Sequence, residues 1–179
     1  MREVFWQKGY AATSLDDLCA ATGMNRPSLY NAFGEKAQVF KAVLDEYVAE
    51  ARPRYEKAFR TPGLRAALHA VYETAFDIYK ELDPKGLGCF MIGAALTDSV
   101  RDPEVAEMIL KQLHEMDKGF GWLLKRAEAE GELRPGVDRR ALTMLASSTH
   151  STLSVRMRAG EPHDDLRRFI GQMVDIICA

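Results

Sequence analysis

Cysteine is scarce in this sequence, and long apolar runs are missing. The 179 residues include three cysteines that stand far apart, which argues against a disulfide framework and indicates a reducing compartment. No stretch approaches the roughly 20 apolar residues needed to span a bilayer. Charged residues interrupt the first ten positions, where a secretory signal would have an apolar core. We therefore expect a cytoplasmic protein that has no membrane partner.

The sequence also lacks a strong net charge and the motifs of common enzymes. Its net charge is −2 and its pI is near 6.1, so bulk electrostatics do not indicate a nucleic-acid binder. The four histidines stand far apart, and the sequence contains no zinc-binding His or Cys motif and no phosphate-binding glycine loop. We expect neither an enzyme nor a bound metal or cofactor.

Apolar residues recur with the period of a helix along nearly the whole chain, and no sustained alternation indicates a strand. This pattern predicts an all-α fold. Three short helices precede Gly34, and a long helix begins near Glu35, which Pro53 is expected to end or bend. A loop is expected at Asp83–Gly86. The change in helix length divides the chain into two predicted domains, residues 1–48 and residues 49–179.

Two short helices between Ser14 and Phe33 have the pattern of a helix-turn-helix, whose second helix enters the major groove of DNA. Ser14 and Asp17 are spaced like a capping box, and Asn25 is a good cap for the second helix. Gly23 suits a left-handed turn between them. The apolar residues that can form the small shared core are Leu15, Leu18, Ala21, Leu29 and Phe33. The residues left near or on the exposed face of the second helix, and so expected at the DNA interface, are Met24, Asn25, Arg26, Pro27, Ser28, Tyr30 and Asn31.

The N-terminal segment resembles the TetR/AcrR family of repressors. The resemblance rests on the run FWQKGYAATSL at 5–15, continued by Leu18, Gly23, Leu29, Tyr30, Phe33 and Lys36. Downstream, the run GELRPGVD at 131–138 is similar to the turn that precedes the two C-terminal helices in these proteins. The resemblance implies a three-helix DNA-binding domain followed by a helical domain for ligand binding and dimerisation. It also implies a ligand-responsive repressor that a small molecule releases from a palindromic DNA operator.

By this resemblance, three groups of residues contact double-stranded DNA. Thr13 and Ser14 would touch backbone phosphate at a helix start, where free N–H groups favour anions. The candidates for contacts at or near base edges are Arg26, Ser28 and Asn31, because Arg suits guanine and Asn suits adenine. Tyr30 and Lys36 would clamp phosphates and so position the reading helix without specifying sequence.

The family resemblance further implies a small-molecule pocket in the middle helices and a homodimer through the last two helices. The ligand-binding candidates are apolar, aromatic or soft side chains and one histidine: Phe76, Tyr79, Cys89, Met91, Met116, Phe120, Trp122 and His150. Each can equally be a core residue. The small polar stretch 147–154 either forms part of the dimer interface or places His150 at the pocket. The apolar stripe from Leu166 to Ile177 is costly to expose and predicts a partner, most simply a second copy.

Three observations keep other interpretations open. Residues 1–50 contain five basic and seven acidic side chains, a weak footprint for DNA, and this favours a helical interaction protein that has lost DNA binding. Cys89 could instead serve as a thiol sensor, although its apolar setting argues for an inert thiol. The first predicted helix starts abruptly for this family, so we expect the natural protein to begin upstream of Met1. An immediate in-frame stop codon upstream would contradict that expectation.

Overall fold

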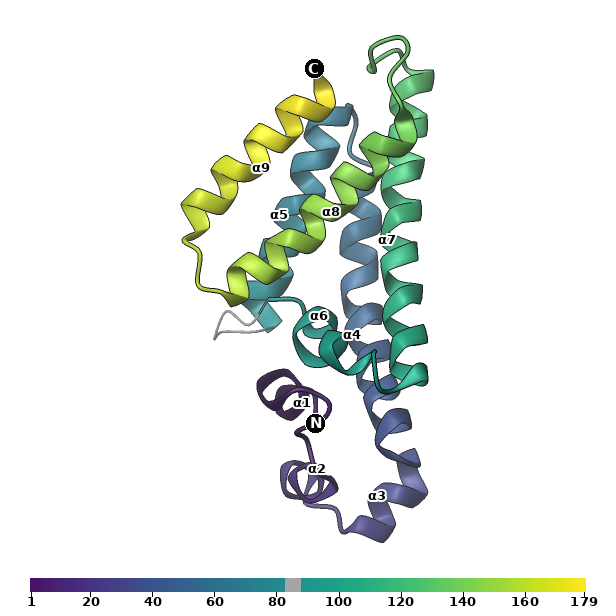
Figure 1. Cartoon of the computed structure of the whole chain (residues 1–179), viewed down its shortest axis with the longest axis vertical. Coiled ribbons are helices and arrows are strands. Elements are labelled where there is room, and N and C mark those ends of the chain that lie inside the picture. The colour runs from purple at the N-terminus through teal and green to yellow at the C-terminus, as the bar shows by residue number, and fades with distance from the viewer. Residues whose placement is uncertain (83–87) are drawn as a thin grey trace. The chain divides into compact units, whose positions relative to one another are not determined.

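The computed structural model describes residues 1–82 and 88–179, and every regular element in these ranges is a helix. The all-α prediction is confirmed, and the loop expected at Asp83–Gly86 lies outside the described residues. The described helices are too short or too polar to cross a membrane. The α-helices, labelled in Figure 1, are α1 (Arg2–Lys8), α2 (Leu15–Thr22), α3 (Arg26–Phe33), α4 (Lys36–Phe59), α5 (Leu64–Leu82), α6 (Phe90–Ala95), α7 (Pro103–Ala129), α8 (Arg139–Arg158) and α9 (His163–Cys178). A 3-10 turn, η1 (Leu96–Asp98), follows α6 directly.

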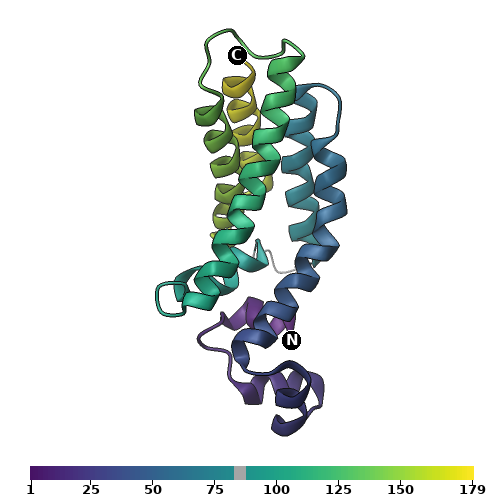
Figure 2. The same ribbon diagram turned by 90° about the vertical axis from the view of Figure 1, so that its right-hand side faces the viewer.

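Helix α4 runs through Pro53, which therefore does not end it. A proline inside a helix removes one backbone hydrogen bond and crowds the preceding turn. Ala51 and Ala58, on either side of Pro53, are buried, so packing of the helix offsets that cost. Figure 2 shows α4 and α7 as long continuous helices.

The chain divides into two compact units whose boundaries fall inside α4 and α7. Unit 1 comprises residues 1–50 and 89–111, and unit 2 comprises residues 51–88 and 112–179. Unit 1 thus contains the three short helices together with α6, η1 and the start of α7. No local pattern in the sequence groups residues 89–111 with the N-terminal helices, and a domain boundary after residue 48 stays a prediction.

Aromatic rings form the core of unit 1. The Trp6 ring on α1 meets the Phe90 ring on α6 edge to face, with centroids 5.4 Å apart. Phe5 packs in the same way against Phe40 of α4, at 5.2 Å. Tyr47, also on α4, lies 5.6 Å from Phe90. These rings supply apolar area that two-turn helices cannot provide alone, and they fix α1 between α4 and α6.

The small core expected between α2 and α3 is only partly correct. Leu18 and Leu29 are buried, but Leu15 and Ala21 are exposed and Phe33 is half-buried. An eight-residue helix has room for one narrow buried stripe, and the aromatic rings of unit 1 complete the interior. Leu15 and Ala21 are therefore surface residues of α2.

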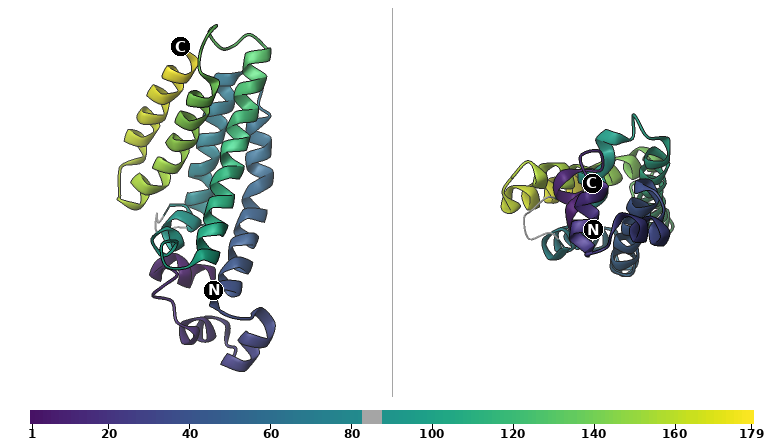
Figure 3. Two further views of the ribbon diagram at one scale, coloured as in Figure 1. Left: turned by 45° about the vertical axis from the view of Figure 1, so that its right-hand side comes forward. Right: turned by 90° about the horizontal axis from the view of Figure 1, so that it is seen from below.

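Helices α5, α8 and α9 pack against one another in unit 2, and α8 and α9 lie side by side in Figure 3. The inward residues of α9 are buried within the chain itself: Leu166, Ile170, Val174 and Ile177. Contrary to the prediction from the sequence, this stripe does not need a second copy to cover it, because α5 and α8 do so. Periodicity shows that a face is buried, but does not show what buries it.

Candidate nucleic-acid interface

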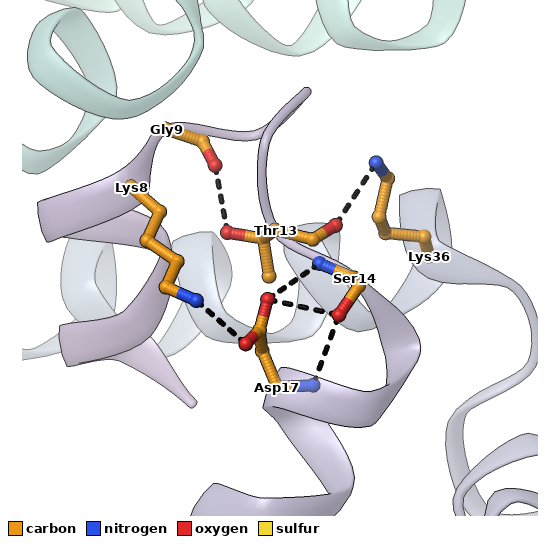
Figure 4. Close-up of polar contacts among 6 residues, drawn as sticks. All are labelled: Lys8, Gly9, Thr13, Ser14, Asp17 and Lys36. Carbon is orange, nitrogen blue, oxygen red and sulfur yellow. Dashed lines mark hydrogen bonds and ion pairs between the residues drawn. The ribbon is translucent and has the colours of Figure 1, made fainter.

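The start of α2 is held by a complete capping box (Figure 4). The Ser14 hydroxyl accepts a hydrogen bond from the Asp17 backbone N–H at 3.1 Å, and the Asp17 carboxylate accepts one from the Ser14 N–H at 3.0 Å. Lys8 donates a further bond to Asp17 at 2.6 Å. This bond and those from Ser14 lower the pKa of Asp17 to about 2. The capping box fixes where α2 begins, and the Lys8–Asp17 bond links this start to the end of α1.

The turn from α2 to α3 follows the sequence prediction closely. Gly23 adopts a left-handed conformation, with φ 70° and ψ 5°, which other residues adopt only at a cost. The Asn25 side-chain oxygen then accepts a hydrogen bond from the Ser28 N–H at 2.8 Å and caps α3. Pro27 lies in the first turn of α3, where helical N–H groups have no internal partner. Local interactions thus account for the start of the second helix of the motif at Arg26.

Most of the predicted DNA-contact residues lie at the surface of this motif. The Tyr30 side chain is 58% exposed, so its hydroxyl group is available to a phosphate. Met24 and Lys36 are half-buried, and Thr13 is buried. The exposed members of the set are Ser14, Asn25, Arg26, Pro27, Ser28, Tyr30 and Asn31.

Thr13 and Lys36 are occupied within the protein. The Thr13 hydroxyl donates to the Gly9 carbonyl at 2.7 Å (Figure 4). The Lys36 ammonium donates to three carbonyls of the α1–α2 turn, those of Tyr10, Ala11 and Thr13, at 3.1, 3.3 and 3.2 Å. It also lies 4.6 Å from the centroid of the Tyr10 ring, a cation–π contact. Both side chains thus stabilise the turn that leads into α2.

The segment 89–111 also binds this turn. The Ala94 carbonyl accepts a hydrogen bond from the Tyr10 N–H at 2.6 Å, and the Asp98 carboxylate accepts one from the Ala11 N–H at 3.0 Å. Asp102 accepts a bond from the Tyr10 hydroxyl at 2.9 Å. Burial, together with the Asp102 carboxylate, raises the pKa of Tyr10. The sequence could not reveal these contacts, because the partners are about 90 residues apart along the chain.

Every basic side chain of residues 1–50 has a partner within the chain. The Arg26 guanidinium pairs with Asp16 through two hydrogen bonds, Nε to Oδ1 at 2.7 Å and Nη2 to Oδ2 at 2.6 Å. Lys8 pairs with Asp17, and Lys36 is bound to carbonyls as described. The remaining two pairs join Arg2 to Glu50 and Lys41 to Asp45. Asp16 was not among the residues singled out from the sequence.

The ligand-binding candidates divide between the two units. Phe76, Tyr79, Phe120 and His150 are buried in unit 2, and the Tyr55 hydroxyl lies 2.9 Å from His150 Nε2. Met116 is half-buried there, and Trp122 is exposed. Cys89 and Met91 are buried in unit 1. Two surface hollows in unit 2, of about 570 and 420 Å³, have none of the eight candidates in their linings.

Comparison with known proteins gives a consistent result. Residues 2–43 match the family model for bacterial regulatory proteins of the tetR family. The chain is 31% identical to the HTH-type transcriptional repressor ComR of Escherichia coli K12, over 94% of this chain and 81% of the relative. It is 51% identical to the HTH-type transcriptional repressor BdcR of the same organism, over 91% of this chain and 78% of the relative.

A solved structure extends the similarity over nearly the whole chain. It is a cysteine mutant of the TetR family transcriptional regulator CifR in complex with 26-base-pair double-stranded operator DNA. The TM-score is 0.86 at 27% sequence identity, with 97% of this chain and 91% of that chain covered. The likeness therefore includes the α-helices of both units and is not confined to α1–α3.

Proposed function

The chain belongs to the TetR family of bacterial regulatory proteins, and we propose that it is a cytoplasmic, ligand-responsive repressor that binds a palindromic operator as a homodimer. Members of this family are transcriptional regulators and not enzymes. The observation that carries the proposal is the start of α3, where Arg26, Ser28 and Tyr30 are exposed on a helix whose N-terminus is capped. In a helix-turn-helix, residues at this position contact base edges.

The DNA-facing residues then have distinct tasks. Arg26, Ser28 and Asn31 would meet base edges or their surroundings, and the exposed Tyr30 hydroxyl would bind a phosphate. Thr13 and Lys36 support the same surface indirectly, since their polar atoms hold the α1–α2 turn. Thr13 is buried, so we assign it a positioning task in place of the phosphate contact expected from the resemblance.

Dimerisation would use the outer faces of α8 and α9. Large apolar side chains remain exposed on both helices: Met144 and Val155 on α8 and Ile176 on α9. Ser148 is exposed on α8 as well, whereas its neighbours Ser147, Thr149 and Ser154 are buried. Exposed apolar groups on adjacent helices favour an isologous contact between two copies. Such a dimer presents two DNA-binding motifs, the α2–α3 pair of each copy, which we call the reading heads, to the two halves of a palindrome.

A small-molecule effector would act through unit 2. The buried set Phe76, Tyr79, Phe120 and His150 combines aromatic area with a hydrogen-bonding nitrogen, as small-molecule sites do. Helices α4 and α7 each contribute residues to both units, so a shift in either helix reaches the reading head. The effector favours release only if it binds the DNA-free state more tightly.

Fluorescence anisotropy with DNA from upstream of the protein's own gene tests this function. The protein should bind this duplex in preference to a scrambled one, and binding should weaken with salt as phosphate contacts require. Arg26→Ala should abolish the preference, and Tyr30→Phe should weaken binding to both duplexes. Equal binding to both duplexes at all salt concentrations would contradict the proposal.

The pairing of every basic side chain in residues 1–50 favours a second candidate, an interaction protein of the same fold that has lost DNA binding. Salt-independent behaviour and no retention on DNA would support it. A thiol sensor at Cys89 is less well supported, because the thiol is buried with the Tyr47 hydroxyl 3.9 Å away. Labelling the folded protein with a thiol reagent tests it, and an unreactive Cys89 would exclude it.

A further inference from the structure

The ion pair between Asp16 and Arg26 joins the two helices of the DNA-binding motif. Asp16 lies in the first turn of α2, and Arg26 is the first residue of α3. Both carboxylate oxygens are used, one by Nε and one by Nη2 of the guanidinium. Such a two-point contact fixes the plane of the guanidinium as well as its position.

The contact leaves the outer edge of the guanidinium unused. A guanidinium has five N–H donors, and Asp16 takes the Nε–H and one N–H of Nη2. Within the described residues, Arg26 has no other hydrogen-bond partner. One N–H of Nη2 and both of Nη1 stay free. Two parallel donors on this edge match the O6 and N7 acceptors that guanine presents in the major groove.

Stability alone gives little reason for this pair. The Asp16 and Arg26 side chains are 69% and 64% exposed, and exposed ion pairs contribute little to folding. A carboxylate on this surface also repels DNA phosphates, which weakens binding to any sequence. A fixed orientation of the arginine is a benefit that offsets this repulsion.

We infer that Asp16 is a positioning residue, which orients Arg26 for end-on recognition of one guanine in each operator half-site. The inference rests on the proposed function. It assigns base discrimination to Arg26 and the sharpness of that discrimination to Asp16. A carboxylate that served only local electrostatics would oppose DNA binding equally at every sequence, so only the positioning role predicts that Asp16→Asn lowers specificity.

The test is fluorescence anisotropy with a duplex that the wild-type chain binds selectively, and with variants of it that carry one changed base pair at a time. A bidentate arginine–guanine contact discriminates by about 5- to 150-fold. Asp16→Asn should reduce the preference for guanine at one position of each half-site by about tenfold, while affinity for scrambled DNA holds or rises. Arg26→Lys keeps the charge but loses the two parallel N–H donors, and should lower the preference for guanine at the same position.

Two further variants complete the experiment. The double variant of Asp16→Asn and Arg26→Lys should discriminate no less than Arg26→Lys alone, because both changes remove one contact. Asp45→Asn is the matched control. Asp45 pairs with Lys41 in the same unit at 56% exposure, so its loss changes the net charge equally and should leave discrimination intact.

The results that would overturn the inference about Asp16 can be distinguished from a failure of the proposed function. If the wild-type chain binds selectively and Asp16→Asn keeps the full preference for guanine, the inference is overturned and the function stands. The inference is also overturned if the Asp16 and Arg26 substitutions relax different base pairs, since Asp16 would then contact a base itself. If the wild-type chain binds no duplex selectively, both fail together.

Discussion

Replacing Lys36 by methionine should destabilise the reading head. Lys36 is half-buried, and the family resemblance assigns it to phosphate binding instead. Methionine keeps most of the apolar stem but loses the ammonium, which donates to three carbonyls at 3.1–3.3 Å and lies over the Tyr10 ring. The bonds are long and partly exposed, so we expect a loss of about 2 kcal/mol for bonds and cation–π contact together.

Urea unfolding followed by tryptophan fluorescence measures this loss of stability in unit 1. Trp6 is buried in unit 1 and Trp122 is exposed in unit 2, so fluorescence in a Trp122→Phe background reports on unit 1. With a urea m-value of roughly 2 kcal/mol per M, the midpoint for Lys36→Met should fall by about 1 M. Protein concentration must be held constant, because dimerisation contributes to apparent stability.

Lys41→Met is the matched control for Lys36→Met. Lys41 is on the same helix, and its ammonium pairs with Asp45 in an exposed ion pair, so its loss should cost less than about 0.5 kcal/mol. Equal midpoints for the two variants would refute a structural task for Lys36. A phosphate clamp predicts another result, namely unchanged stability and a salt dependence of DNA binding reduced by about 0.9 per reading head.

Three further predictions concern unit 2. Burial lowers the pKa of His150 from 6.5 to about 4. Between these pH values His150 is therefore protonated in the unfolded chain and neutral in the folded chain. Stability should therefore fall by up to ~3 kcal/mol as pH decreases through this range, and less in His150→Gln; parallel pH profiles in urea unfolding would contradict this. A Cβ on Gly119 would lie 2.7 Å from an aromatic ring, whereas one on Gly121 meets only an ordinary contact at 3.7 Å. Thermal unfolding should show Gly119→Ala destabilised by about 1–3 kcal/mol and Gly121→Ala stabilised by about 0.5–1 kcal/mol. A Gly119→Ala variant that is more stable than Gly121→Ala would contradict the close packing at Gly119. Sedimentation should show Ile176→Glu as a monomer, whereas the control Leu110→Glu, at similar exposure in unit 1, should stay a dimer; a dimeric Ile176→Glu would rule out α9 as the interface.

Local interactions account for what the sequence predicted correctly. Ser14, Asp17 and Asn25 act on backbone groups three residues away, so spacing alone identified where α2 and α3 begin. Gly23 likewise fits a turn that local sterics require. The family resemblance depends on the same short-range pattern, and it led to the correct family.

Contacts distant in sequence account for the rest. Nothing local joins Asp16 to Arg26, ten residues away across a turn, or Tyr10 to Asp102. The stripe on α9 was interpreted as an interface because its period shows burial without a partner's identity. No local pattern places residues 89–111 beside the N-terminal helices, because the packing of α6 against α1 joins segments far apart in the sequence.

The most direct test of the central claim is selection of wild-type binding sites from a random library of double-stranded DNA. A repressor dimer with two reading heads should enrich one inverted repeat, with half-site centres about one helical turn of DNA, or a multiple of it, apart. The enriched duplex should bind two or more copies of the chain in an even number. Recovery of unrelated sequences, or of none above background, would contradict the account of this protein as an operator-binding regulator.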